Sequence, residues 1–355
     1  MEAESGAPIA GAFVVLQSPS GQRLDAGLSS SSGHFVVHAP GPGTYRLRSD
    51  RIGYASASSE LFELAPDEDV SRRLEVTVRP VELAAMAVES RSRCEMLPTE
   101  SLEIHTVWEE ARKALAALVW TGQQQYYRFD ALLFERALDP RGEPTGEPAF
   151  EEVRVYGRHP FRSAHARDLA LGGFVRPSGG LVVYYAPDAD VLLSDDFLAR
   201  HCFRLVRGDD RGSAGLLGLA FEPIPERRVP DISGTMWIDT ESSELRSLDF
   251  RYENLQVRVS TRNLGGRVVF ARLPSGAWIV RSWVIRVPVI GPGPPGRSVS
   301  GRLLPPRQAL RGIDEGGGHV TAVWMTGELA GSVSTDTLPV RPPPDSLIAR
   351  FPVPF

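Results

Sequence analysis

The sequence has little lysine, little cysteine and no long apolar run. In its 355 residues Lys113 is the only lysine, so arginine supplies the rest of the 39 basic residues. The formal net charge is −5 and the two signs are interspersed, which leaves no basic stripe for a nucleic-acid backbone. No apolar stretch approaches the ~18 residues of a membrane-spanning helix. The composition therefore favours neither nucleic-acid binding nor a transmembrane segment.

Motifs of well-known catalytic chemistries are also missing. The zinc-protease pattern His-Glu-x-x-His and the nucleophile pattern Gly-x-Ser-x-Gly do not occur. Residues 316–318 are three consecutive glycines, but the lysine that follows the glycines of a phosphate-binding loop is missing here. His201 and Cys202 are neighbours on a predicted strand, so their side chains point to opposite faces. We therefore expect no catalytic residue and no cofactor.

The densest group of metal-ligand residue types is His159, His165 and Asp168. The two histidines lie six residues apart in a predicted loop, where they could meet a metal ion, although exposed loop histidines are commoner. Together with Asp195 and Asp196 they define the alternative hypothesis, a hydrolase whose active site has no sequence motif.

The stretch 6–54 carries the most specific pattern of the chain. A proline-led turn precedes the apolar run Phe13-Val14-Val15-Leu16, and glycine turns precede the segments 34–37 and 44–48. Strand, glycine turn and strand at this short spacing are typical of an antiparallel sandwich. Two further strands are expected at 61–64 and 74–78.

Four pieces of this stretch resemble the carboxypeptidase regulatory-like domain, a transthyretin-like β-sandwich of the carbohydrate-binding-like folds. The pieces are Pro8-Ile9-Ala10-Gly11-Ala12, Gly33-His34-Phe35, Gly43-Thr44-Tyr45-Arg46-Leu47 and Arg51-Ile52-Gly53-Tyr54. The resemblance covers residues 1–80, where the family's first strand is missing. It implies export, to the periplasm or to the outer membrane, although no signal segment begins at Met1. We therefore expect a removed or misassigned N-terminus.

Export bears on the two cysteines. An even number of cysteines in an exported chain permits one disulfide, here between Cys94 and Cys202. Two buried free thiols are the alternative.

Residues 81–104 are predicted to be a linker, and a helix should open the domain that spans 105–335. Thr106 to Glu109 reads as a capping box, which places the start of the helix there. Trp108, Ala111 and Leu115 share one face of it, opposite Glu110 and Lys113. Residues 336–355 form a proline-rich tail that should be extended.

From 125 onward the pattern predicts one strand after another. Residues 232–239 and 244–252 form the clearest hairpin, and 266–273 with 277–287 form a second one. Sequential hairpins favour an antiparallel meander that curls into a half-barrel or barrel. In strand pattern the segment 234–248 resembles the curved sheets of periplasmic lipoprotein carriers. The fold class is therefore mainly β, a sandwich followed by a meander with one packed helix.

Aromatic side chains on the predicted strands are candidates for a ligand groove, namely Tyr184, Tyr185, Trp237 and Trp283. Plain core packing is the alternative for each ring. The sequence thus predicts a non-enzymatic, exported binding or scaffold protein, whose curved sheet binds an apolar or glycan ligand or a partner protein of the cell envelope. A purely structural envelope protein is a further alternative.

Overall fold

The structure is a computed structural model. It describes residues 1–78, 102–125, 127–157, 159–178, 181–208, 214–255, 263–293, 296–297, 303–304, 307–325 and 328–332. No helix in these ranges is long and apolar enough to cross a membrane. Both the expected linker and the expected proline-rich tail lie almost entirely outside the described residues.

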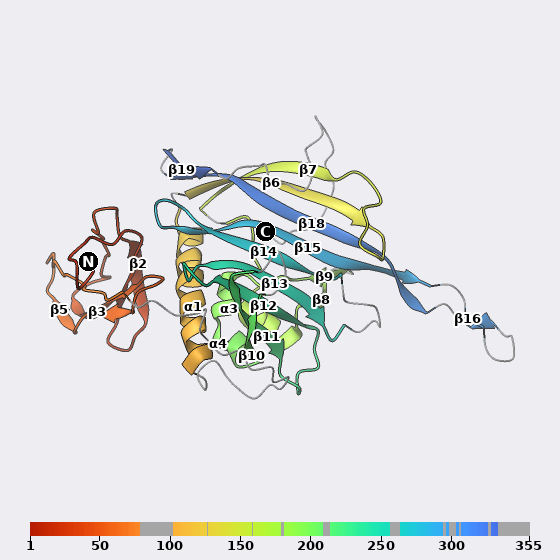
Figure 1. Ribbon diagram of the computed structural model, residues 1–355, viewed down its shortest axis with the longest axis horizontal. Helices are drawn as coiled ribbons and strands as arrows, with labels where there is room; N and C mark the ends of the chain where they lie inside the picture. Colours follow the sequence, from red (N-terminus) through yellow and green to blue (C-terminus); the bar gives the residue numbers. More distant parts are fainter. Residues whose placement is uncertain are drawn as a thin grey trace.

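The N-terminal part is a small β-sandwich (Figure 1). Its strands are β1 (Phe13–Gln17), β2 (Arg23–Leu28), β3 (Gly43–Asp50), β4 (Ala57–Ser58) and β5 (Phe62–Leu64). They are ordered β2-β1-β3-β4, and β5 pairs with β3. Every other residue of β1 and β3 points into a core formed by Val14, Leu16, Tyr45, Leu47 and Leu74.

The strand predicted at 34–37 is absent, and β2 takes its place beside β1. The reason lies in the backbone donors of this segment. His34 N–H donates to Ser30 Oγ at 3.2 Å, and His38 N–H donates to Asp25 Oδ2 at 2.6 Å. Side-chain oxygens thus satisfy donors that a sheet ladder would otherwise use. The predicted strand at 74–78 is likewise reduced to single bridges at Val76 and Val78.

The C-terminal part is built on one ten-stranded sheet in which all pairs are antiparallel (Figure 1). Its strands are β6 (Tyr127–Leu138), β7 (Ala149–Tyr156), β10 (His201–Arg207), β11 (Leu216–Pro223), β12 (Asp231–Asp239), β13 (Leu245–Glu253), β14 (Gly265–Arg272), β15 (Trp278–Pro292), β18 (Gln308–Met325) and β19 (Glu328–Ser332). The order runs from β10 through β15 to β18, β6 and β7, with β19 beside β18. The mainly β prediction, with sandwich and meander, is confirmed; the meander stays an open sheet.

Two small hairpins stand apart from this sheet. One joins β8 (Val175–Ser178) to β9 (Leu181–Tyr184), and the other joins β16 (Gly296–Arg297) to β17 (Leu303–Leu304). The sequence pattern placed residues 181–185 in the meander itself, but β9 pairs with β8 alone.

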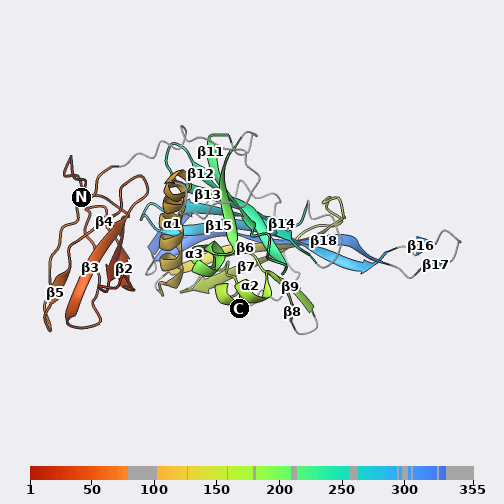
Figure 2. The same cartoon turned by 90° about the horizontal axis from the view of Figure 1, so that it is seen from below.

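Helices cover one face of the large sheet, as Figure 2 shows for α1, α2 and α3. They are α1 (Leu102–Gln123), α2 (Ala166–Gly172), α3 (Ala189–Leu193) and α4 (Asp195–Leu198). α1 includes Leu102, so the predicted capping box lies inside the helix. Thr106 Oγ1 donates to the Leu102 carbonyl at 2.7 Å, which is the back-bond of a threonine within a helix.

The centre of β18 is unusual because three consecutive glycines lie in a strand with neighbours on both sides. A Cβ on Gly317 would lie 2.6 Å from the Phe134 ring, and one on Gly318 would lie 2.4 Å from the Trp283 ring. Gly316 has far more room, since its nearest neighbour is a backbone oxygen at 3.8 Å. Rings from β6 and β15 therefore fill the space that side chains of β18 would occupy.

α1 is buried on two sides, because the sandwich packs on the face that the sequence pattern assigned to solvent. Lys113 Nζ lies 2.6 Å from Glu110 Oε1 and donates to the Tyr54 carbonyl at 2.8 Å. Gly53 N–H donates to Glu110 Oε2 at 3.1 Å. The side chains of Glu110 and Lys113 are only 5% exposed. The Arg51-Ile52-Gly53-Tyr54 piece of the sandwich thus contacts a buried ion pair on the helix.

Further contacts extend this junction along the helix. Arg112 Nη2 lies 3.3 Å from Asp50 Oδ2, and Trp120 Nε1–H donates to the Ala26 carbonyl at 2.9 Å. Burial alone would raise the pKa of Asp50, but Arg112 and Arg48 outweigh it and hold that pKa below its usual value. The sandwich is therefore attached to α1 by these polar contacts, and Phe13 and Ile52 of the sandwich belong to the same apolar core as the helix.

Candidate functional site

The candidate site is a groove of about 500 Å³ on strands β10–β13. It lies on the face opposite the four helices, which we call the outer face. The inner face is set by alternation: Leu219, Met236 and Leu248 are 0% exposed and pack in the core. Their neighbours along each strand point outward and line the groove.

One row of side chains crosses the middle of the groove. Arg204 of β10 pairs with Ala220 of β11, Ala220 with Thr235 of β12, and Thr235 with Asp249 of β13. The three strand spacings place the Cα atoms of Arg204 and Asp249 about 14 Å apart. Small side chains on β11 and β12 thus form the floor, and long charged side chains stand at its two sides.

Trp237 forms one end of the groove and is held from both sides. Its benzo edge covers Gly218, where a Cβ would lie 2.8 Å from Trp237 Cζ3. Its Nε1–H donates to Asp249 Oδ2 at 2.9 Å. Arg267 in turn donates to Asp249, with Nε 2.6 Å from Oδ1 and Nη2 2.8 Å from Oδ2. The indole is therefore fixed before any ligand arrives.

The opposite end carries hydroxyl and carboxylate groups. Ser233 pairs with Arg251, and its Oγ donates to Glu253 Oε1 at 2.7 Å. Glu222 of β11 lines the same end. The groove thus passes from an aromatic ring, past arginines, to acceptors for hydroxyl groups.

Three arginines of the groove are exposed and have no partner among the described residues. Arg204, Arg228 and Arg251 line it, and none of them forms an ion pair or a hydrogen bond with a described residue. By contrast, Arg246 of β13 and Arg267 of β14 are both paired with aspartates. These three guanidinium groups would attract a negatively charged group to the groove.

Beside the groove lies a buried cluster of Arg227, Asp231 and His201. Arg227 Nε bonds Asp231 Oδ2, and its Nη1 and Nη2 donate to the carbonyls of Ala170 and Leu169 at 2.7 and 3.0 Å. His201 Nδ1 lies 2.9 Å from the Phe197 carbonyl, and its Nε2 lies 3.3 Å from Asp231 Oδ1. Every polar group of the cluster faces protein, so it holds β10, β12 and α2 together.

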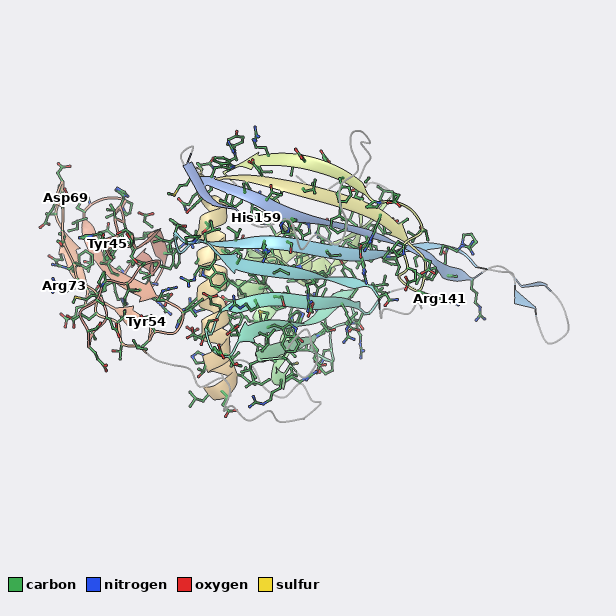
Figure 3. The ribbon with its side chains drawn as sticks, turned by 45° about the horizontal axis from the view of Figure 1, so that its top comes forward. Tyr45, Tyr54, Asp69, Arg73, Arg141 and His159 are labelled. Carbon is green, nitrogen blue, oxygen red and sulfur yellow. The ribbon has the colours of Figure 1, made fainter. Side chains whose placement is uncertain are left out.

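The predicted ligand cluster of His159, His165 and Asp168 is not assembled. His159 lies inside the sheet domain (Figure 3), where Phe161 N–H donates to its Nδ1 at 3.0 Å and its Nε2 lies 2.8 Å from the Val280 carbonyl. Burial lowers the pKa of His159 to about 4, so the ring is neutral at pH 7. His165 is the N-terminal cap residue of α2, and Asp168 lies in its first turn. Among the described residues no three His, Cys, Asp or Glu side chains are placed to hold a metal ion.

The other two acids of the alternative hydrolase site, Asp195 and Asp196, lie in the first turn of α4. Asp196 forms an ion pair there with Arg200, Nη1 being 2.7 Å from Oδ1. The N-cap hydroxyl of Ser194 accepts the Phe197 N–H at 3.1 Å, so this short helix is capped by its own chain. His159 cannot act with these acids while both of its ring nitrogens contact the backbone.

Of the four aromatic candidates, only Trp237 lines the groove. Trp283 is a core residue 8% exposed, with its ring 5.5 Å from that of Phe161. Tyr184 stands edge-on to Tyr252 at 5.2 Å, and Tyr185 lies under the guanidinium of Arg176.

Cys202 is buried on β10, and Cys94 lies outside the described residues, so their disulfide stays a prediction.

Sequence reasoning did not single out the groove arginines. Arg204, Arg228 and Arg251 lie on or beside three different strands, and arginine is common throughout the chain. The alternation of strand side chains could have placed Arg204 and Arg251 outward. Only the pairing register brings them to one groove.

Comparisons with known proteins identify the N-terminal part. A search of curated proteins finds no match to the chain. Among solved structures, a DUF1329 family protein from Desulfovibrio piger is matched at 8% identity over 60% of this chain and 91% of that chain, with a TM-score of 0.26, a similarity too low to assign a fold. The family model of the carboxypeptidase regulatory-like domain matches residues 2–79. These residues therefore form a carboxypeptidase regulatory-like domain, as the four sequence pieces indicated.

Proposed function

We propose that this protein is a non-enzymatic binding protein of the bacterial cell envelope. It binds a polar ligand in the outer-face groove, and it holds that ligand in a fixed orientation to the regulatory-like domain. The observation that carries the proposal is the groove itself, with a fixed indole at one end and three arginines, without a partner in the described part of the chain, around a floor of small residues.

The chemistry of the groove favours a polar ligand over an apolar one. Its lining includes the hydroxyls of Ser233 and Thr235 and the carboxylate of Glu222. The inner face of the same strands is filled by core side chains such as Met236 and Tyr252, both 0% exposed. An acyl chain would have to displace packed residues there, whereas a glycan or a polar partner finds an open site on the outer face.

The attachment of the sandwich supports a scaffold role. Flexibly tethered modules share few buried contacts, but here the buried ion pair of α1 forms hydrogen bonds with the backbone of Gly53 and Tyr54 in the sandwich. Binding at the groove would therefore place the ligand at a set distance from whatever the regulatory-like domain contacts. The resemblance of this domain to exported proteins supports a location outside the cytoplasm.

A glycan array tests the proposal. We expect the full chain to bind at least one class of glycan, and we expect Thr235→Arg to abolish that binding because the new side chain would fill the groove floor. Thr145→Arg is the matched control, since Thr145 is exposed in the turn after β6, far along the sheet order from β12. Binding that survives Thr235→Arg would contradict a ligand site in this groove, and a chain that binds no glycan at all would contradict a glycan as its ligand.

A further inference from the structure

The arrangement of charge along the groove points to the class of ligand. Arg204 lies one register row from Trp237. Arg251 and Glu222 lie two rows away, and Glu253 lies three rows away. A ligand that fits this order has an acidic group in the middle and hydroxyl groups toward the carboxylates.

Pairing within the groove leaves a surplus of positive charge. Asp249 is neutralised by Arg267, and Arg227 by Asp231, so neither pair attracts an ion. The positive charges that remain are those of Arg204, Arg228 and Arg251. They outnumber the two remaining carboxylates, which belong to Glu222 and Glu253. Guanidinium groups bind carboxylates with two parallel hydrogen bonds, which gives geometric selectivity as well as attraction.

A peptide would find few partners on this surface. The floor strands β11 and β12 each have a neighbouring strand on both sides, so a peptide could add as a strand only at the outer edge of β10 and not across the floor. What it offers is side-chain chemistry: hydroxyls, carboxylates, guanidinium groups and one indole. Such groups suit a ring with many hydroxyls, an apolar face and an acidic substituent.

We propose that the groove binds an acidic saccharide, whose acidic group is held by Arg204 and Arg251 and whose ring packs on Trp237. This inference rests on the proposed function, because it names the ligand class of the same groove. The hydroxyls of the sugar then donate to Glu222 and Glu253. A neutral saccharide lacks the group that the arginines attract, and an acidic peptide lacks the sugar hydroxyls.

Titration calorimetry on the full chain tests this. The probes are tetragalacturonic acid, its fully methyl-esterified neutral form, a tetramannuronic acid, a sulfated heparin tetrasaccharide and a hexaglutamate peptide. We expect an acidic saccharide to bind at least tenfold more tightly than the neutral ester and than hexaglutamate, with affinity falling as salt rises. The carboxylated and sulfated probes distinguish the two sources of negative charge.

The variants locate the interaction. Arg251→Gln should weaken binding of the acidic probe at least tenfold, and Arg246→Gln, an exposed arginine on the same strand outside the groove, should change it less than twofold. Equal affinity for the neutral ester would overturn recognition of charge but leave glycan binding intact. Tighter binding of hexaglutamate would assign the groove to a peptide. If none of the acidic saccharides binds, the inference is wrong, and the glycan array then decides whether the proposed function fails with it.

Discussion

Lys113 Nζ lies 2.6 Å from Glu110 Oε1, and the two side chains are buried between α1 and the regulatory-like domain. Gly53 N–H and the Tyr54 carbonyl complete their hydrogen bonds. Removing one member of a buried ion pair leaves the other charge without compensation, which is costly. The only lysine of the chain thus has a structural role at the junction of its two parts.

Lys113→Met should therefore lower the free energy of unfolding by about 3 kcal/mol, measured by urea denaturation. The double variant Glu110→Gln/Lys113→Met should lose less, because no buried charge remains and the amide still accepts from Gly53. Arg246→Met, which breaks exposed pairs, serves as control and should cost less than ~1 kcal/mol. A Lys113→Met variant as stable as that control would show that the junction does not depend on the pair.

A second contact of the junction is made by two glycines. A Cβ on Gly276 would lie 2.4 Å from Gly11 Cα, and both residues have positive φ. Gly276→Ala should lower the melting temperature by several degrees, since backbone strain and a backbone clash add. Gly21→Ala is the matched control, because Gly21 has almost the same φ but no atom within 4 Å. If the melting temperature falls equally in the two variants, backbone strain alone explains the decrease, and the contact between Gly276 and Gly11 is not a cause.

Two glycines of β18 allow a similar comparison between a crowded and an uncrowded position. Gly318→Ala should cost about 2 kcal/mol, because its methyl group would collide with the Trp283 ring in a packed strand. Gly316→Ala should be nearly neutral, since it meets nothing closer than 3.8 Å. Thermal unfolding followed by calorimetry compares the two directly. Similar stability of both variants would mean that the ring moves aside at no cost.

His159 should make the fold sensitive to mild acid. Its pKa is about 4 in the folded chain against 6.5 for the free side chain, so the unfolded state binds the proton first. Stability is fully present above pH 6.5 and falls as the pH drops toward 4, by about 3 kcal/mol in total. The measurement is the free energy of unfolding at several pH values. Burial also lowers the pKa of His201 to about 4, so His159→Asn should make this part of the curve less steep but not flat. His105→Asn, at an exposed histidine of α1, should leave it unchanged; an equally steep curve for His159→Asn would assign the acid sensitivity to other groups.

How much of the fold can be predicted from the sequence depends on how many residues each pattern spans. The hairpin of β12 and β13 was predictable, because Leu248, Phe250 and Tyr252 alternate and a short turn fixes the register. β2 was missed since its six residues include glycine and aspartate and are only partly buried. α3 and α4 are too short for helical periodicity to show, and their capping residues Asp188 and Ser194 are the only local signal.

The site was harder to predict from the sequence than the fold. Trp237 could be proposed as a groove residue from its strand position, but Trp283 has the same signal and lies in the core. The difference comes from the register, which places Trp237 on the outer face beside Gly218. Glu110 and Lys113 were assigned to solvent because they lie opposite the apolar face of α1. That assignment was wrong, since the helix contacts two domains and has no free polar face.

The most direct test of ligand binding at the groove follows the indole Nε1–H signals of the protein by NMR. The chain has six tryptophans, and Trp237→Phe identifies the signal of Trp237. On addition of an acidic saccharide that binds the chain, we predict that this signal shifts, while those of the core residues Trp278 and Trp283 stay in place. A saturating ligand that leaves the Trp237 signal unmoved would contradict the proposed site.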